Sequence, residues 1–206
     1  MTLLAAVNLA PEQYQEPLLD TLERFRISNS IEFLATVYYE SEYLTVLTEN
    51  LNYSCDALLK KFSRKRISYA DAMKHGRSSR SKANQEAIAN ILYGGTFGRT
   101  ELGNYLPGDG WHYRGQGAIQ LTGHANWKDF GDYLGRPDIG DNPIIALRDP
   151  LLTCYTAGWF WTNLKKLHTQ GTNMRAITKK VTGAADTAIK TRLAYRDRIK
   201  QLMEAP

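Results

Sequence analysis

The stretch GGTFGRTELGNYLPGDGWHYRGQGAIQLTGHANW, residues 94–127, separates two groups of helix-like segments. Its first half, residues 94–110, contains six glycines and one proline, a composition that predicts a long loop in place of a helix or long strand. Its second half is dense in aromatic and amide side chains. Long loops inside compact domains are often functional, so this stretch is the first candidate for a functional site.

On both sides of this stretch, apolar residues recur at helical spacing and polar residues mark helix starts. Ser68 and Asp71 form a capping-box pattern, and Asp149-Pro150 suits a cap followed by a first turn. No run alternates long enough to predict a strand. The fold is therefore expected to be mainly α, with little or no β-sheet. The expected helices lie near residues 17–28, 30–46, 54–65, 69–75, 82–93, 123–134, 150–164, 173–181 and 186–203.

Length and composition indicate one ordinary globular domain. The 206 residues fall in the usual range of a single compact domain, so we expect one catalytic domain over 1–206 and no separate cell-wall-binding domain. Cys55 and Cys154 belong to no CxxC pair, which argues against a disulfide framework or a zinc cluster. The start MTLLAAVNLAPEQ has no basic region and only a broken apolar stretch, so we expect no signal peptide and synthesis in the cytoplasm.

The charge favours an anionic partner. A net charge of +5 and a pI near 9.1 fit nucleic acid, a membrane surface or a carboxylate-bearing cell wall, and charge does not choose among them. The densest basic run extends from Lys60 to Arg66, a pattern most often found on a solvated face. No nucleic-acid-binding motif accompanies it.

Glu40 is a carboxylate on an apolar helix row. In EFLATVYYESEYL, residues 32–44, it shares a row with Phe33, Val37 and Leu44, whereas Glu42 lies off that row. Burial among apolar neighbours would raise the pKa of Glu40, as a general acid requires. The alternative is that Glu40 forms a buried ion pair or lies at the edge of the row.

Glu49 follows the expected end of the same helix and could face the same cleft from a turn. Two carboxylates so placed suit an inverting glycosidase, whose base activates water about 6.5 to 9.5 Å from the acid. Asn52 and Tyr53 could orient that water. Other chemistries lack their motifs, because the chain has no GxSxG, GxxxxGK[ST], HExxH or paired CxxC and its four histidines have no ligand-like spacing. We therefore expect neither a metal nor a cofactor.

Three stretches resemble the phage endolysin branch of glycoside hydrolase family 19, relatives of the plant-type chitinases. FLATVYYESEYLTVLTENLNYS (33–54) is similar to the helix that carries the general acid and to the second Glu that follows it. GDGWHYRGQGAIQLTGHANW (108–127) is similar to the family core GDGxxYRGRGxIQLTGxxNY, and ITKKVTGAADTAIKTRLAY (177–195) to its C-terminal segment. The resemblance spans about residues 30–195 and implies a lysozyme-like or chitinase-like helical fold with a substrate cleft.

The resemblance also implies roles for individual residues. It makes Glu40 the general acid, Glu49 the general base and Thr122 a holder of the attacking water, with Glu101 in the Gly-rich loop as the reserve base. The residues expected to bind or line the sugar site, together with an arginine behind the carboxylates, are Gln120, Asn126, Tyr113, Arg114 and Arg192. Tyr113 could instead belong to the core, Arg114 could tie loops together, and Arg192 could be a helix-surface charge.

The sequence departs from the family pattern around these residues. Tyr39 stands where the family usually has His, Ser41-Glu42 replaces Ser-Gly, Gln116 replaces Arg, and residues 181–184 replace INGG. Glu40, Glu49, Gln120 and Asn126 are present, which favours an active enzyme over a dead relative.

The expected function is hydrolysis of the β-1,4 bond between N-acetylmuramic acid and N-acetylglucosamine in peptidoglycan, by a monomer released through a holin pore, with no nucleic acid partner and no stable membrane insertion. A chitinase is the first alternative. A catalytically silent wall- or nucleic-acid-binding module is the second.

Overall fold

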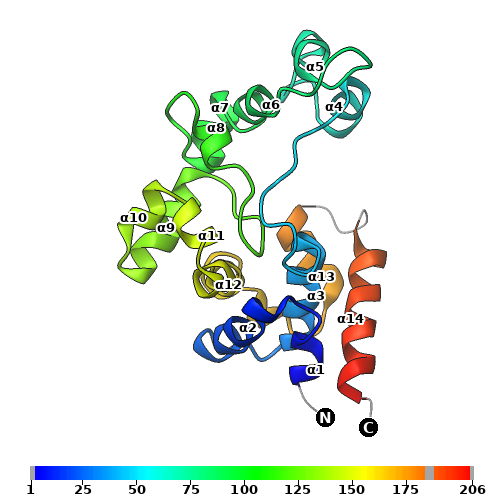
Figure 1. Cartoon of the computed structure of the whole chain (residues 1–206), viewed down its shortest axis with the longest axis vertical. Helices are drawn as coiled ribbons and strands as arrows, with labels where there is room; N and C mark the ends of the chain where they lie inside the picture. Colours follow the sequence, from blue (N-terminus) through cyan, green and yellow to red (C-terminus); the bar gives the residue numbers. More distant parts are fainter. Residues whose placement is uncertain (1–2, 184–187, 205–206) are drawn as a thin grey trace. The chain divides into compact units, whose positions relative to one another are not determined.

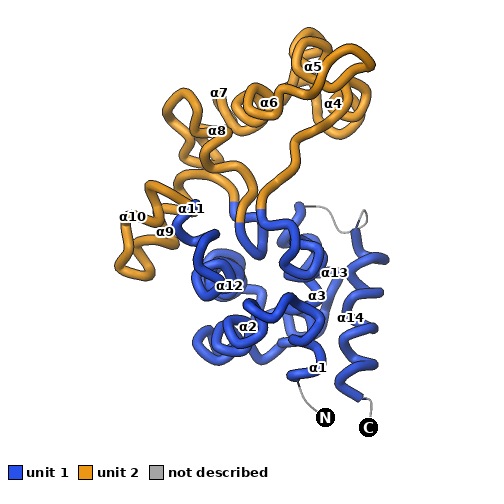
Figure 2. Tube along the Cα trace, viewed as in Figure 1, with its two compact units in different colours: residues 1–47, 117–121, 144–206 blue, residues 48–116, 122–143 orange. Residues whose placement is uncertain are grey.

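The structure is a computed structural model that describes residues 3–183 and 188–204. It divides into two compact units, coloured separately in Figure 2. Unit 1 comprises residues 1–47, 117–121 and 144–206, and unit 2 comprises residues 48–116 and 122–143. The chain therefore passes from one unit to the other four times. The expectation that residues 1–206 act as one catalytic domain remains a prediction.

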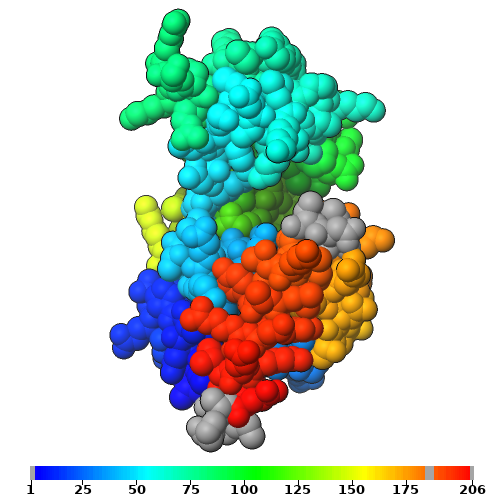
Figure 3. Space-filling model, turned by 90° about the vertical axis from the view of Figure 1, so that its right-hand side faces the viewer, coloured from blue at the N-terminus to red at the C-terminus, as the bar shows by residue number. Residues whose placement is uncertain are grey.

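Unit 1 is built around two helix pairs. Helix α3 packs along the C-terminal helix α14, and α2 packs along α12 (Figure 1). Atoms of α14 cover much of the face of unit 1 that Figure 3 turns to the viewer. Phe33 of α3 meets Trp161 edge to face, with ring centroids 5.4 Å apart, and both side chains are fully buried. The helices of unit 1 are α1 (Leu3–Val7), α2 (Glu12–Arg24), α3 (Ser30–Ser41), α11 (Ile144–Leu147), α12 (Pro150–Trp159), the π-helix η2 (Phe160–Leu164), the 3-10 helix η3 (Leu167–Gln170), α13 (Met174–Thr182) and α14 (Ile189–Glu204).

Unit 2 has a core of its own. Leu51, Leu58, Ile67, Ile88 and Leu92 belong to a buried apolar cluster to which α4, α5 and α6 contribute residues. Helices α9 and α10 pack together at the other end of the unit's sequence. The helices of unit 2 are α4 (Cys55–Lys61), α5 (Tyr69–His75), α6 (Gln85–Leu92), α7 (Gly95–Phe97), the π-helix η1 (Gly98–Leu102), α8 (Asp109–His112), α9 (His124–Leu134) and α10 (Pro137–Asp141).

The expected mainly α fold is confirmed. Extended pairing within the described ranges is limited to two isolated bridges, Thr48 with Gln116 and Ser54 with Arg77. The expected caps are also present, since Ser68 accepts a hydrogen bond from the Asp71 amide and Asp149 accepts from two amides at the start of α12. Over residues 3–183 and 188–204, no helix is long and apolar enough to cross a membrane.

Two expectations about element boundaries were wrong. The helix expected over 30–46 ends at Ser41, because Glu42, Tyr43 and Leu44 take left-handed φ angles of 48°, 59° and 66°. The loop expected over 94–110 contains the helical turns α7 and η1 and the start of α8. Its glycines permit these tight turns: a Cβ on Gly98 would lie 2.2 Å from the Tyr93 carbonyl oxygen.

Several helical turns were also missed. Helices α1, α10 and α11 have five residues or fewer, too few to show an apolar period. Helix α2 begins at Glu12 and contains Pro17 as its sixth residue, where proline removes one backbone hydrogen-bond donor.

Candidate active site

Glu40 lies in the last turn of α3, and its carboxylate forms an ion pair with Arg192 of α14. The Glu40 side chain is 20% exposed, whereas that of Arg192 is fully buried. Arg192 is therefore not the helix-surface charge that the sequence left as an alternative. The pair agrees both with an arginine behind a catalytic carboxylate and with the buried ion pair that was the structural alternative for Glu40.

The apolar surroundings expected for Glu40 need a correction. Phe33 and Val37 are fully buried, but Leu44 lies beyond the end of α3 and Arg192 contacts the carboxylate itself. Glu42 is exposed, as expected. The microenvironment of Glu40 is thus set by a cation from a distant part of the sequence, which helical periodicity could not reveal.

The aromatic ring of Tyr39 lies against Arg192. Its guanidinium lies over the Tyr39 ring at 4.4 Å from the centroid, and Tyr39 meets Tyr195 edge to face. Nε and Nη1 of Arg192 have no hydrogen-bond partner within the part of the chain that the structure describes. Tyr39, which replaces the usual histidine, therefore contributes a ring face to the arginine that holds Glu40.

Glu49 precedes α4 and is fixed by contacts within unit 2. The Tyr93 hydroxyl lies 2.8 and 2.7 Å from its two carboxylate oxygens, and the Gly115 amide donates to Oε2 at 3.3 Å. The Glu49 amide in turn donates to the Gly115 carbonyl at 2.8 Å. The Tyr93 hydroxyl and the Gly115 amide thus hold the carboxylate, and the bond from the Glu49 amide to the Gly115 carbonyl fixes its backbone.

Tyr93 was not identified from the sequence. It caps the C-terminal end of α6, where the apolar run QEAIANILY predicts only core packing. Burial, followed by the charge of Glu49, raises the pKa of Tyr93 well above its usual value, so its hydroxyl stays protonated and donates. Only the three-dimensional fold shows that this hydroxyl meets a carboxylate 44 residues earlier in the sequence.

Arg114 lies near the same carboxylate. Its guanidinium stacks on the Trp111 ring at 3.6 Å and donates to the Trp111 carbonyl at 2.7 Å. Burial lowers the pKa of Arg114, and the charge of Glu49 opposes that shift. Arg114 thus buttresses the loop that presents Gly115 to Glu49.

The remaining expected residues are held in defined positions. Gln120 has a left-handed φ of 55° and donates to the Gly117 carbonyl at 3.3 Å. Asn126 donates to the Thr122 carbonyl at 2.7 Å at the start of α9. The buried Tyr113 ring lies 4.8 Å from His124, and its hydroxyl donates to the Asp141 carbonyl at 3.4 Å. The roles of Gln120, Asn126, Thr122 and Tyr113 toward a sugar stay predictions.

Asn52, Tyr53 and Glu101 make other contacts. Tyr53 packs against Phe62 and bonds to Lys61, while Asn52 is exposed. Glu101 is exposed and accepts from Thr100 at 3.2 Å. The hydrogen bonds of the Glu49 carboxylate to described residues come from Tyr93 and Gly115 alone. Asn52 and Tyr53 would therefore have to act on water or substrate directly.

The structure thus groups the expected residues by unit. Glu40, Arg192 and Gln120 belong to unit 1, and Glu49, Arg114, Tyr113, Thr122, Asn126, Asn52 and Tyr53 belong to unit 2. Ala184, one of the residues in place of INGG, falls outside the described residues. The described residues include no group of three or more His, Cys, Asp or Glu side chains arranged to hold a metal ion.

Known proteins resemble this chain in sequence and in fold. A "Glycosyl hydrolase family 19 domain-containing protein" of Haemophilus influenzae is 37% identical over 129 residues, which cover 63% of this chain and 58% of that protein. Rice "Chitinase 6" (Oryza sativa subsp. japonica) is 31% identical over 90 residues, 40% of this chain and 33% of that protein. The matched regions therefore span less than two thirds of either relative.

The fold matches a solved bacterial family 19 chitinase, with a TM-score of 0.60 and 17% identity over 98% of this chain and 92% of that chain. No family model matches the sequence. The chain is a homologue of glycosyl hydrolase family 19 proteins, and it has the fold of the family 19 chitinases.

Proposed function

We propose that this chain is an endolysin that hydrolyses the β-1,4 bond between N-acetylmuramic acid and N-acetylglucosamine in bacterial peptidoglycan. The observation that carries the proposal is that both glutamates expected to act are held by specific partners, Glu40 by Arg192 and Glu49 by Tyr93 and Gly115. Side chains that must meet a substrate in fixed positions need such support. The relatives support a glycoside hydrolase.

The reaction is a single displacement. Glu40 donates its proton to the glycosidic oxygen as the bond to the anomeric carbon breaks, and the Arg192 guanidinium stabilises the carboxylate that remains. Glu49 takes a proton from water, whose oxygen forms the new bond to that carbon from the opposite face. Thr122 helps to hold the water, and Gln120, Asn126, Tyr113 and Arg114 contact the N-acetylated sugars. The product has inverted configuration.

Charge favours the cell wall over chitin as the substrate. The chain carries a net charge of +5, which attracts a polymer with carboxylates but not a neutral one. The similarity to proteins named chitinases supports hydrolysis of β-1,4-linked N-acetylglucosamine as the alternative. For delivery we propose synthesis in the host cytoplasm as a monomer, release through a holin pore and action on the periplasmic wall.

Activity assays on two substrates test these proposals. Lysis of outer-membrane-permeabilised Gram-negative cells and hydrolysis of chitin oligomers are measured for the wild type, Glu40→Gln and Glu49→Gln, with circular dichroism to verify folding. We expect wall lysis by the wild type, loss of activity in Glu40→Gln and an inverted product. Full lysis by Glu40→Gln would exclude it as the acid, and a retained configuration would contradict the mechanism.

The other outcomes choose between the alternatives. Cleavage of chitin without wall lysis would establish the chitinase. Activity retained in Glu49→Gln but lost in Glu101→Gln would transfer the role of base to the Gly-rich loop. Binding to walls without hydrolysis of either polymer would establish the silent binding module.

A further inference from the structure

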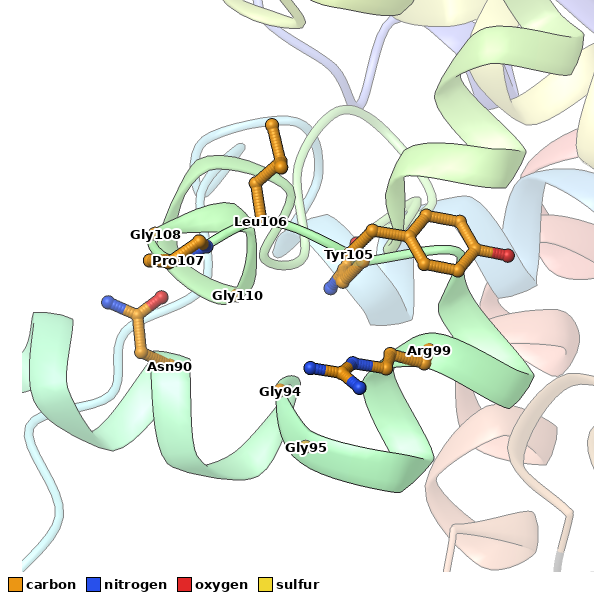
Figure 4. Close-up of a pocket in the computed structure, with 10 residues that line it drawn as sticks. Asn90, Gly94, Gly95, Arg99, Tyr105, Leu106, Pro107, Gly108 and Gly110 are labelled. Atoms are coloured by element: carbon orange, nitrogen blue, oxygen red, sulfur yellow. The ribbon is translucent and has the colours of Figure 1, made fainter.

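Unit 2 contains a cavity of about 360 Å³ that has no role in the proposed chemistry (Figure 4). Its floor is the end of α6 with α7 and η1, and its opposite wall is the segment 104–110. The lining residues are Asn90, Gly94, Gly95, Arg99, Asn104, Tyr105, Leu106, Pro107, Gly108 and Gly110. No acidic side chain lines this cavity, so Arg99 gives it a positive charge.

Two side chains offer hydrogen-bond donors to the cavity. The Arg99 guanidinium extends over Gly94 into the space, and Asn90 projects from α6 toward Pro107 (Figure 4). Within residues 3–183 and 188–204, Arg99 has no ion pair or hydrogen bond. Asn90 uses its amide oxygen to accept from the Trp111 amide at 2.9 Å, which leaves its NH₂ group to donate. Both donors suit an oxygen-rich anion.

Neighbouring carboxylates are engaged elsewhere. Asp109 accepts from the Leu106 amide at 2.8 Å and so fixes the loop that forms the wall, while Glu101 contacts Thr100. Tyr105 and Leu106, 66% and 71% exposed, lie at the rim and face away from the cavity.

Glycines keep the cavity open. A Cβ at Gly95 or Gly108 would meet no atom within 4 Å, so both positions border free space, and their φ angles of +59° and +94° favour glycine. The fold thus leaves bare backbone beside the two donors. A ligand can approach the chain closely there.

The cavity is linked to the carboxylate expected to act as base. Asn104 in its wall donates to the Tyr93 carbonyl at 2.9 Å, and its side-chain oxygen accepts from the His124 amide at 2.9 Å. The Tyr93 hydroxyl holds Glu49, and Gly94 of the cavity follows Tyr93 directly in the chain. One short segment therefore carries both a support of Glu49 and a wall of the cavity.

We propose that this cavity binds a carboxylate carried by the N-acetylated sugar polymer, and that Arg99 makes the enzyme prefer carboxylated strands over neutral ones. The inference rests on the proposed function and deepens it. The planar guanidinium can pair with both oxygens of a carboxylate, and Asn90 adds a third donor. On strands that carry peptides the carboxylate belongs to the peptide, because the lactyl carboxyl is amide-linked to it; on strands without peptides the lactyl group itself is the carboxylate.

Kinetics on matched substrates test the proposal. Rates are measured for the wild type, Arg99→Gln, Arg99→Lys and the control Arg148→Gln, which removes the same charge from an exposed position in unit 1. The substrates are intact walls, walls with carboxyls converted to amides, amidase-treated strands without peptides, and chitin oligomers. We expect Arg99→Gln to raise KM on intact walls about tenfold or more, as the loss of a charge-assisted hydrogen bond implies. Arg99→Lys should have a smaller effect on KM, and Arg148→Gln should have little effect.

The substrates also locate the carboxylate. The effect of Arg99→Gln should vanish on amidated walls and on chitin oligomers. If it persists on peptide-free strands, whose lactyl carboxyl is free, the cavity also accepts the lactyl carboxylate, and if it disappears there, the cavity binds only a carboxylate of the peptide. Equal losses on walls and chitin, or no loss on walls that the wild type lyses, would overturn the role of Arg99. Failure of the wild type to lyse walls would instead overturn the proposed function.

A binding measurement gives a readout independent of activity. N-acetylmuramic acid and N-acetylglucosamine are titrated into ¹⁵N-labelled wild type, and the amide signals of Gly94, Gly95 and Gly108 are followed. We expect shifts with the acidic sugar, weaker shifts with the neutral one, and loss of the difference in Arg99→Gln. Identical shifts with both sugars would contradict a carboxylate site even if the walls prove not to be the substrate.

Discussion

At the residue scale, the contact between Glu40 and Arg192 couples activity to stability. Arg192 is fully buried and its Nη2 atom meets the Glu40 carboxylate. Removing one partner of a buried ion pair leaves an uncompensated charge, a loss of up to about 3–5 kcal/mol that is reduced here because Glu40 is partly exposed. We expect Glu40→Gln to lower the free energy of unfolding by about 1–3 kcal/mol, measured by urea denaturation.

The double variant distinguishes this cause from a general disturbance. Arg192→Met replaces the cation with an apolar side chain, so Glu40→Gln combined with Arg192→Met should be more stable than the sum of the single losses predicts. Additive losses would show that the pair does not couple the two side chains. Neither Arg192→Met nor the double variant should lyse walls. The double variant lacks the general acid, and Arg192→Met lacks the cation that supports this acid.

The Tyr93 hydroxyl positions Glu49 at 2.8 and 2.7 Å. Tyr93→Phe removes this donor and keeps the ring in the core, so we expect kcat to fall about tenfold with little change in thermal stability, the scale of one hydrogen bond to a charged group. Since the pKa of Tyr93 is raised well above 10, the wild type should show no loss of activity from its ionisation up to pH 10. Tyr69→Phe, at a position 65% exposed, is the control. Unchanged kcat in Tyr93→Phe would refute the positioning role.

Glu32 makes stability depend on pH. It is 2% exposed, its Oε1 has no hydrogen-bond partner among the described residues, and burial raises its pKa above 4.5 against the opposing charges of Lys200 and Arg196. The folded state therefore binds the proton more tightly than the unfolded state, and stability falls as pH rises from about 4.5 through the folded pKa. We expect Glu32→Gln to be more stable than the wild type at pH 7, with the gain shrinking toward pH 4. Urea unfolding of both proteins at several pH values measures this gain in the free energy of unfolding. A gain that is constant with pH would show that it does not come from the ionisation of Glu32.

At the element scale, α2 and α12 approach closely at Gly158. A Cβ there would lie 2.4 Å from Phe25 Cδ2 and 2.7 Å from Thr21 Cγ2. We expect Gly158→Ala to lower the free energy of unfolding by about 1–3 kcal/mol through overpacking, measured by thermal and urea denaturation. Leu151→Ala, at the exposed start of the same helix, should cost less. A free energy of unfolding that is higher in Gly158→Ala than in the wild type would contradict overpacking between α2 and α12.

At this scale, the presence of a helix could be predicted from the sequence more reliably than the residues at which it begins and ends. The apolar period and the Ser68 and Asp149 caps identified α5 and α12 from sequence alone. The end of α3 could not be predicted, because three consecutive non-glycine residues take left-handed φ angles there. Short turns such as α10 are formed by packing against α9, a tertiary effect that no local pattern contains.

The residues of the candidate site also fall into two groups, those that could be predicted from the sequence and those that could not. Glu40, Glu49 and Arg192 could be named from resemblance, and the structure pairs Glu40 with Arg192. Tyr93 and Arg99 could not, since one looks like a core residue of α6 and the other like an exposed charge in a glycine-rich loop. Their significance depends on long-range contacts and on a cavity, which the order of residues alone does not specify.

At the scale of the whole molecule, positive charge is concentrated in one segment. Residues 55–82, which include α4 and α5, contain nine lysines and arginines and two aspartates, an excess of seven, while the whole chain has a net charge of +5. The rest of the chain is therefore slightly acidic. If the substrate is the anionic wall, this segment should dominate long-range attraction to it.

Salt dependence tests this charge distribution. We expect binding of the Glu49→Gln protein to purified walls, measured by co-sedimentation, to weaken between 50 and 200 mM NaCl, as the screening length shortens to about 10 Å near 0.1 M. Replacing the exposed Lys60, Lys65 and Lys74 with glutamine should weaken binding about tenfold at low salt and flatten its salt dependence. Replacing the equally exposed Lys166, Lys179 and Lys180 of unit 1 removes the same net charge and should weaken binding much less. Equal losses in the two triple variants would show that attraction follows the total charge of the molecule and not its concentration in residues 55–82.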